Sequence, residues 1–217
     1  MADKDSRAGL AYMTPGILDW VASVHAPHDV ALARAFDAPA AEGMPAIQLG
    51  PSEAKAVALF LKLAGARKVV EVGTLAGYSA LAMARALPAD GHVDTIEFDQ
   101  KHARVARENI AAAGLADRIT VHEGAGLDVL PRLAPVGPFD AVFIDADKRN
   151  YDAYGRWAAG NVRPGGLLIG DNAFLFGRLL EDSEEGAALR RFHEEARAAF
   201  DTVCLPTPDG MLLGVRR

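Results

Sequence analysis

Acidic and amide side chains follow two apolar stretches in the second half of the chain. Asp145 comes directly after the stretch 139–144 (FDAVFI). Asp171 and Asn172 come directly after the stretch 167–170 (LLIG). Both stretches are typical of buried parallel strands, whose carboxyl ends meet at one edge of the sheet. Two carboxylates and an amide oxygen suit Mg²⁺, Mn²⁺ or Ca²⁺ rather than Zn²⁺, so the pattern predicts a divalent-metal site, with helix caps and turn aspartates as the alternative.

A lysine follows the first of these aspartates at a distance of three residues. An ammonium group beside a divalent cation is destabilised, because the two positive charges repel each other. Lys148 is therefore a candidate general base. A solvated lysine is the alternative, and the spacing alone does not distinguish the two.

A glycine-containing turn lies between the first apolar stretch and the helical segment after it. In EVGTLAGYS (71–79), Gly73 and Gly77 allow a sharp turn that lies against a ligand, and the N–H groups that begin the helix face that ligand. The spacing is neither G-x-G-x-x-G nor a phosphate-binding loop, which disfavours dinucleotide and nucleoside-triphosphate sites. A tight turn with packing glycines is the alternative.

A second acidic position ends the next expected strand. Glu97 lies 24 positions after Gly73, an offset that suits hydrogen bonds to both hydroxyls of a ribose. Asp99, two residues further on, is the competing candidate. A solvent-exposed loop acid is the non-functional alternative, and we favour Glu97 as the ribose ligand.

The elements that must position these residues alternate along the chain. Apolar stretches typical of strands are separated by helical segments and occur at 68–72, 92–97, 118–122, 139–144 and 167–170. This alternation predicts βαβ units and a single α/β domain over residues 1–217, with a doubly wound, mostly parallel sheet of the Rossmann type. Near the C-terminus, 201–205 and 211–215 flank a short turn, which predicts an antiparallel hairpin at the sheet edge.

Residues 1–65 differ in pattern and are expected to form a helical layer over the sheet and the mouth of the site. Three helical segments are expected there, at 17–24, 30–36 and 52–64. The prediction makes Ser52 the N-cap of the third segment and 39–49 a connector broken by proline and glycine. Residues 174–186 are expected to form a mobile loop.

The composition excludes several classes of protein. The chain has 217 residues, 50% of them hydrophobic and 24% charged, which is typical of one globular domain. A net charge of −6 without a long basic run argues against nucleic-acid binding. The lone cysteine, Cys204, indicates a reducing compartment. We expect a cytoplasmic protein with no membrane association, because the chain has neither a long apolar run nor a signal-peptide pattern in MADKDSRAGL.

Four motifs together resemble a known family. They are EVGTLAGYSA (71–80), FIDADKRNY (143–151), RPGGLLIGDN (163–172) and PDG (208–210). The chain resembles class I S-adenosylmethionine-dependent methyltransferases and, within them, the cation-dependent O-methyltransferases of the catechol and caffeoyl-coenzyme-A group. The resemblance covers the chain from about Met44 to the C-terminus. It implies a seven-stranded sheet whose last strand is antiparallel.

The resemblance also implies a role for each candidate residue. The metal ligands would be Asp145, Asp171 and Asn172, with Lys148 as the catalytic base, and Asp145 would also touch the amino group of the cofactor. Further cofactor contacts would come from Glu71, Gly73 and Ser79 at the methionine end, Glu97 at the ribose and Ala125 beside the adenine.

The mechanism that the resemblance implies is direct methyl transfer. A divalent cation, Mg²⁺ before Mn²⁺ or Ca²⁺, would chelate two vicinal hydroxyls of a small aromatic acceptor and acidify one of them. Lys148 would remove its proton, and the phenolate would attack the methyl group of S-adenosylmethionine in line. A homodimer is also expected from the family. The segments 171–177 and 44–50 depart from the family pattern, so the identity of the acceptor carries over least.

Two alternatives stay open at this point. One is a nicotinamide-dependent oxidoreductase on a similar sheet, against which the glycine spacing argues. The other is a non-catalytic subunit that binds S-adenosylmethionine. Such a subunit has no need of the metal ligands and the base, yet this sequence retains all four residues, Asp145, Lys148, Asp171 and Asn172.

Overall fold

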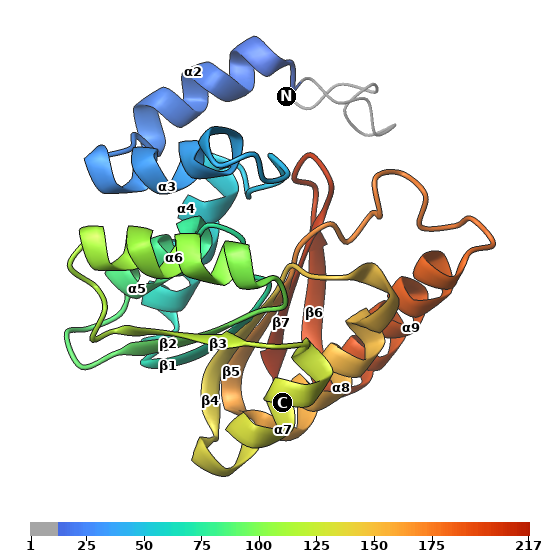
Figure 1. Ribbon diagram of the computed structural model, residues 1–217. Helices are drawn as coiled ribbons and strands as arrows, with labels where there is room; N and C mark the ends of the chain where they lie inside the picture. Colours follow the sequence, from blue (N-terminus) through green and yellow to red (C-terminus); the bar gives the residue numbers. More distant parts are fainter. Residues whose placement is uncertain (1–12) are drawn as a thin grey trace.

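Residues 13–217 are described by a computed structural model, and seven strands of this part form one sheet in the order β3-β2-β1-β4-β5-β7-β6 (Figure 1). The strands β1 to β5 pair in parallel, whereas β7 runs antiparallel to both β5 and β6. The predicted doubly wound sheet with an antiparallel C-terminal hairpin is therefore confirmed. The strands are β1 (Lys68–Val72), β2 (His92–Glu97), β3 (Ile119–Glu123), β4 (Phe139–Ile144), β5 (Val162–Gly170), β6 (Phe200–Leu205) and β7 (Met211–Arg216).

Helices cover both faces of the sheet, and alternating strand residues contact the two layers (Figure 1). In β1, Val69 packs on the side of α4 (Pro51–Leu63), α5 (Tyr78–Ala86) and α6 (Gln100–Ala112), while Val70 packs on the opposite side. The opposite layer consists of α7 (Gly126–Leu133), α8 (Tyr151–Asn161) and α9 (Glu184–Ala199), with short 3₁₀ turns at Ala134–Val136 and Lys148–Asn150. Two apolar cores therefore fix the strand ends from both sides.

The N-terminal helices stack outside α5 and α6. The helix α2 (Pro15–His25) has no buried residue, and α3 (Val30–Ala41) packs inside it against the body of the molecule (Figure 1). The predicted connector at 39–49 is wrong at its start, because α3 continues to Ala41 with Pro39 in its last turn. Helical bonds resume after the proline, since the Glu42 amide donates to the Ala38 carbonyl at 2.9 Å.

The start of α4 also differs from the prediction. Its N-cap is Gly50 rather than Ser52, and Pro51 occupies the first helical position, where its lack of an N–H costs nothing. The carboxylate of Glu53 accepts a hydrogen bond from the Gly50 amide at 3.1 Å. The N-cap therefore lies two residues earlier than a search for a side-chain cap suggests.

The strand β5 is longer than its apolar sequence. It begins at Val162, directly after α8, although only Leu167–Gly170 was expected to be extended. Pro164 and Gly165 are exposed, and the register with β4 is irregular before Leu167. The extra length is a loosely paired entry to the buried part of the strand.

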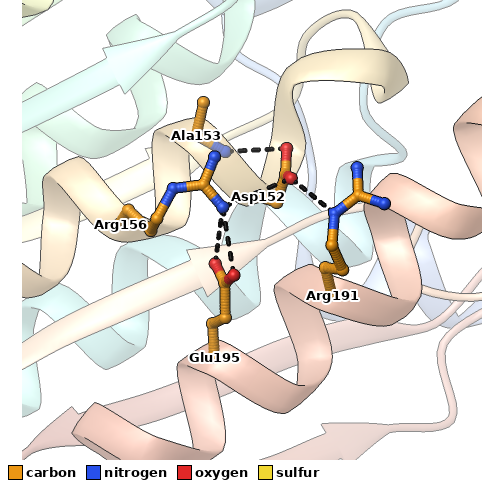
Figure 2. A network of polar contacts seen from close by, with 5 residues as sticks. All are labelled: Asp152, Ala153, Arg156, Arg191 and Glu195. Carbon is orange, nitrogen blue, oxygen red and sulfur yellow. Dashed lines mark hydrogen bonds and ion pairs between the residues drawn. The ribbon is translucent and has the colours of Figure 1, made fainter.

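A polar network joins α8 to α9 on the outer side of the sheet (Figure 2). Asp152 accepts hydrogen bonds from the Ala153 amide at 2.9 Å, from Arg191 at 2.8 Å and from Arg156 at 3.3 Å. Arg156 also contacts both carboxylate oxygens of Glu195, at 2.8 and 3.1 Å. These contacts fix α9 against α8.

No helix among residues 13–217 combines the length and the hydropathy that a membrane span requires. The expectation about a signal peptide concerns MADKDSRAGL, which lies outside the described residues.

Candidate active site

A cleft of about 810 Å³ lies at the carboxyl ends of β1, β2 and β4, the edge at which open α/β sheets bind ligands. Its opposite wall comes from the connector before α4 and the loop after β5. Seven of the nine predicted site residues line it: Gly73, Ser79, Glu97, Ala125, Asp145, Lys148 and Asn172. The other two, Glu71 and Asp171, lie just behind the wall. The strand ends therefore bring the predicted residues into one site.

The glycine turn after β1 requires glycine at its first position. Gly73 has a φ of +99°, and a Cβ atom there would collide with the carbonyl oxygen of Asp145. Gly77, with a φ of +85°, is the N-cap of α5 and packs against the backbone of Ala106. The backbone of this turn thus passes directly beside the end of β4 and lines the cleft.

Glu71 supports the cleft from within the protein. Its side chain is fully buried and accepts hydrogen bonds from the hydroxyls of Ser79 and Thr95. Burial raises the pKa of Glu71 to about 8, because these two hydrogen bonds offset only part of the cost of removing the charge from water. Ser79 lines the cleft and Glu71 fixes its hydroxyl, so Glu71 reaches the cleft through that residue.

The structure distinguishes the two acids after β2. Glu97 lines the cleft, and one carboxylate oxygen accepts hydrogen bonds from the amides of Thr74 and Leu75, at 3.2 and 2.7 Å. Asp99 caps α6 instead, accepting from the amides of Lys101 and His102 at 2.8 and 3.1 Å. Glu97 is therefore the acid that can reach a ribose, and it ties the glycine turn to β2.

Adjacent strands deliver the three predicted metal ligands. Ile144 of β4 pairs with Gly170 of β5, so Asp145 and Asp171 are the first residues beyond a matched pair. The Asp171 amide donates to the Ile144 carbonyl at 2.9 Å, which closes the gap between the two strand ends. Asn172 has a φ of +51°, a strained conformation for a residue other than glycine.

One oxygen of the buried Asp171 carboxylate lacks a donor. Its side chain is 5% exposed, and its Oδ1 atom is buried without a hydrogen-bond partner. Burial, and next the negative charge of Asp145, raise the pKa of Asp171 to about 8. Buried polar atoms in proteins are rarely left unpaired, so this oxygen is available to accept a ligand contact.

These residues fit a hard divalent cation. Asp145, Asp171 and Asn172 offer two carboxylates and an amide, which is the donor chemistry of Mg²⁺ or Mn²⁺ sites that keep positions free for other ligands. Within residues 13–217, no three His, Cys, Asp or Glu side chains gather as a metal cluster, and the set named here contains two carboxylates and one amide.

Lys148 lies beside these acids on the cleft wall. Its Nζ atom is 3.2 Å from Oδ1 of Asp145, and its side chain is 14% exposed. It begins the short 3₁₀ turn that connects β4 to α8. Lys148 lines the cleft, so its amino group lies where a molecule bound there can contact it.

The loop after Asn172 is anchored by the turn between β6 and β7. The amides of Phe174 and Phe176 donate to the backbone and side-chain oxygens of Asp209, at 2.9 and 2.7 Å. Gly210 lies under the Phe174 ring, where a Cβ atom would come within 2.7 Å. The motif PDG (208–210) thus lies in the turn that holds this loop, and Phe176 of the loop lines the cleft.

Sequence reasoning assigned no role to four aromatic residues that line the cleft: Tyr78, Phe98, Tyr154 and Phe176. Phe98 is 78% exposed and directly follows Glu97. An apolar ring next to the candidate ribose ligand was the signal in the sequence that could have identified Phe98 as a cleft residue. The Tyr154 hydroxyl donates to Asp147 at 2.5 Å, and its ring leaves room only for a glycine at position 126. Ala125, the predicted adenine neighbour, is the N-cap of α7 beside this ring.

Comparison with known proteins identifies related sequences over most of the chain. A family model described as O-methyltransferase matches residues 23–217. A catechol O-methyltransferase of Niastella koreensis is 41% identical over 199 residues, which cover 86% of this chain and 90% of the relative. A catechol O-methyltransferase of Mycobacterium tuberculosis is 44% identical over 161 residues, 74% of this chain and 73% of the relative.

Solved structures of related proteins share the fold. An O-methyltransferase from Bacillus cereus in complex with SAH superposes with a TM-score of 0.89 at 36% identity, over 93% of this chain and 97% of that chain. An O-methyltransferase from Streptomyces achromogenes involved in tomaymycin synthesis, in complex with SAM, gives a TM-score of 0.86 at 31% identity, over 94% and 99% of the two chains. Both similarities extend over more than nine-tenths of this chain.

Proposed function

This chain belongs to the O-methyltransferase family, and from that premise we propose that it methylates one hydroxyl of a vicinal dihydroxy aromatic acceptor with the help of a divalent cation. The methyl donor is S-adenosylmethionine, as in the related structures. The observation that carries the proposal is the buried, unpartnered carboxylate oxygen of Asp171 beside Asp145 and Lys148. Family membership also favours this activity over a nicotinamide oxidoreductase and over a non-catalytic subunit.

In this proposal the first half of the sheet binds the methyl donor. Glu97 accepts hydrogen bonds from the ribose hydroxyls, and Ala125 lies beside the adenine. Gly73 and Ser79 contact the methionine end, while Glu71 orients the Ser79 hydroxyl. The support for this arrangement is that the four direct contacts line one wall of the cleft, and that the turn after β1 is fixed to Glu97 by two hydrogen bonds.

The second half of the sheet holds the acceptor. Asp145, Asp171 and Asn172 hold the cation, Mg²⁺ before Mn²⁺ or Ca²⁺, which acidifies the acceptor hydroxyls when bound. Lys148, in its neutral form, accepts the proton of the reacting hydroxyl at Nζ. The oxygen forms a bond to the methyl carbon as the carbon–sulfur bond breaks, and the electron pair of that bond stays on sulfur. The protein contributes position and charge stabilisation.

The acceptor is a small aromatic molecule, because the free wall of the cleft is apolar beside the acids. Phe176 is 60% exposed and Ile47 is 72% exposed, and both line the cleft. An aromatic ring can stack against such side chains while its hydroxyls face Asp145 and Lys148. The segments that carry these two residues depart from the family pattern, so they set the shape of the acceptor that fits.

A methyl-transfer assay with matched acceptors tests this function. Purified protein and S-adenosylmethionine are incubated with catechol, caffeic acid, resorcinol and guaiacol, and products are measured by mass spectrometry. We expect monomethylated products from catechol and caffeic acid, which have vicinal hydroxyls, and none from resorcinol or guaiacol. Equal methylation of resorcinol would overturn the vicinal acceptor. No product from any diphenol, with the donor bound, would overturn the acceptor class.

We also propose that the protein is a homodimer. The helix α2 has no buried residue, and Ile17, Trp20 and Val24 are 49%, 66% and 50% exposed along one side of it. Apolar side chains at this spacing form a stripe that favours a partner. Light scattering coupled to size-exclusion chromatography should give twice the chain mass, and Trp20→Asp should shift the mass toward the monomer. A monomeric wild-type protein would contradict the dimer.

A further inference from the structure

The hydroxyl of Tyr151 lies at the junction of β4, β5 and the candidate base. Tyr151 is the first residue of α8 and is fully buried. Its hydroxyl is 3.0 Å from the carbonyl oxygen of Asp171 and 3.2 Å from that of Ile144. The Nζ atom of Lys148 is 2.8 Å from the same hydroxyl. One buried oxygen therefore contacts both strand ends and the lysine.

The hydrogen-bonding capacity of a phenol assigns the direction of each contact. The hydroxyl has one hydrogen, which it donates to the carbonyl oxygens of Asp171 and Ile144, and its lone pairs are left to accept from Lys148. The Nζ atom also lies 4.6 Å from the centre of the Tyr151 ring and 3.2 Å from Asp145. The lysine head is thus held from two sides, by a carboxylate on the cleft wall and by a tyrosine behind it.

Such support matters because a lysine side chain is flexible. Its four-carbon stem has about 2 kcal/mol of rotamer entropy, so an unsupported Nζ atom samples many positions. A general base acts only within hydrogen-bond reach of the proton it removes. Tyr151 does not line the cleft, and it therefore influences a bound acceptor only through another residue.

We propose that Tyr151 is a positioning residue whose hydroxyl holds Nζ of Lys148 at the strand ends that carry Asp145 and Asp171. The inference rests on the proposed role of Lys148 as the base. The proposal goes beyond the role of Lys148, because it requires the hydroxyl of a buried tyrosine outside the cleft for efficient methyl transfer.

The variant Tyr151→Phe removes the hydroxyl and keeps the ring. The edge-on contact of the ring with Phe192, at 5.4 Å between centroids, survives this change. The Ile144 carbonyl keeps the Asp171 amide as a donor, whereas the Asp171 carbonyl loses the hydroxyl that donates to it. The fold is therefore expected to persist, and thermal unfolding together with the affinity for S-adenosylmethionine checks this directly.

A double-mutant cycle tests the proposal. The wild type, Tyr151→Phe, Lys148→Ala and the double variant are compared with catechol, S-adenosylmethionine and Mg²⁺. We expect Tyr151→Phe to lower kcat about tenfold, the upper end of one hydrogen bond's contribution, while KM for S-adenosylmethionine changes less than twofold. In the Lys148→Ala background, the same change should alter kcat less than twofold, because residues that act through one another are not additive.

The outcomes separate the two proposals. If Lys148→Ala is impaired but Tyr151→Phe keeps the wild-type kcat, the positioning role is overturned and the base is retained. An equal loss from Tyr151→Phe in both backgrounds overturns it as well, because the tyrosine then acts independently of the lysine. Wild-type kcat in Lys148→Ala overturns the base assignment, and the positioning role with it.

A measurement without turnover provides a second test. Acetylation of lysines by acetic anhydride is followed at the peptide level in the metal-free protein, with Lys55 as an internal reference. We expect Lys148 to react severalfold faster in Tyr151→Phe than in the wild type, relative to Lys55, because its amino group is no longer held. Unchanged relative reactivity overturns the proposal. If Tyr151→Phe does not fold, 3-fluorotyrosine at position 151 is used instead, because it keeps the ring and weakens the hydroxyl as an acceptor. We then expect a smaller rise in the acetylation rate of Lys148 relative to Lys55. An unchanged relative rate would overturn the proposal in this variant as well.

Discussion

Two aspartates of this protein have nearly the same small exposed fraction, but their pKa values are shifted in opposite directions. Asp152, on the outer side of α8, is 7% exposed, and Asp171, at the end of β5, is 5% exposed. Burial would raise the pKa of Asp152, but hydrogen bonds from Arg191, Ala153 and Arg156 outweigh it and lower that pKa (Figure 2). The pKa of Asp171 is raised to about 8 by its burial and by the nearby charge of Asp145.

The difference shows that a small exposed fraction alone does not decide the pKa of an acid, because Asp171 lies deeper in the protein and has fewer donors than Asp152. In the network around Asp152, each charged side chain has a partner of opposite charge. The network therefore joins α8 to α9 and leaves no unpaired charge that could bind a ligand. The acids at the cleft have one cation, Lys148, and an oxygen without a partner. A fold that leaves a buried carboxylate underpaired loses stability there, and such sites are where ligands and reactions are accommodated.

The largest expected effect on activity comes from replacing Lys148, and its neighbour Arg149 provides the comparison. Lys148 contacts Asp145, whereas Arg149 contacts Glu185 at 2.7 Å and Glu184 at 3.3 Å on α9. Lys148→Ala should lower kcat about 10²–10⁴-fold, the range for loss of a general base. Arg149→Ala is the matched control and should retain kcat. Initial rates decide between them, and equal losses would remove the distinction between the two regions.

Asp171→Asn should remove the response to metal. The amide keeps the shape of the side chain but supplies no charge, so we expect the affinity for Mg²⁺ and kcat each to fall at least about tenfold, within the range of losses from altered metal-site contacts. Titration of activity with Mg²⁺ measures both. In EDTA, the free energy of unfolding at pH 9 should not fall, because the variant no longer buries a charge. An unchanged metal response would exclude Asp171 as a ligand.

Glu71→Gln should flatten the pH dependence of stability. In the folded protein the pKa of Glu71 is about 8, above its ordinary value of 4.5. Its contribution to stability is therefore complete below pH 4.5 and is lost as pH rises through 8. Glutamine mimics the protonated acid, so the free energy of unfolding of the variant should rise relative to the wild type between pH 5 and pH 9. Urea unfolding at these pH values measures the trend, and a constant difference would contradict it.

Asp152→Asn should have the smallest effect and only on stability. Both arginines of the network are about half exposed, so the loss of charge should cost about 1 kcal/mol of unfolding free energy. The kcat and the response to Mg²⁺ should match those of the wild type. Chemical denaturation and the methyl-transfer assay measure the two quantities. A loss of metal response here would show that the two regions are coupled.

The sequence predicted the sheet well because its signals are local. The stretch FDAVFI matches β4 at both ends, because a nearly all-apolar sequence of this length is typical of a strand that is covered on both faces. Ser52 and Pro39 misled because serine and proline have general preferences that the specific context overrode. Pro51 took the first position of α4, and the last turn of α3 tolerated Pro39.

The site residues at strand ends could be predicted from the sequence, whereas contacts that depend on the packing of distant segments could not. Asp145 and Asp171 follow strands, so parallel pairing alone brings them together. The contacts of Tyr151 and of Asp209 join segments whose meeting depends on how α8 and the C-terminal hairpin pack. No spacing in a single sequence encodes the long-range contacts of Asp209. Lys148 and Tyr151, in contrast, are only three residues apart, so their spacing was an available signal for the support behind Lys148.

The most direct test of the central claim is removal and return of metal in the methyl-transfer assay. The wild-type protein is treated with EDTA, dialysed and assayed with catechol and S-adenosylmethionine before and after addition of Mg²⁺, with donor binding measured in parallel. The account predicts that methylation disappears with the metal and returns with it, while the donor binds throughout. Methylation that persists without metal would contradict the assignment of Asp145, Asp171 and Asn172 as ligands.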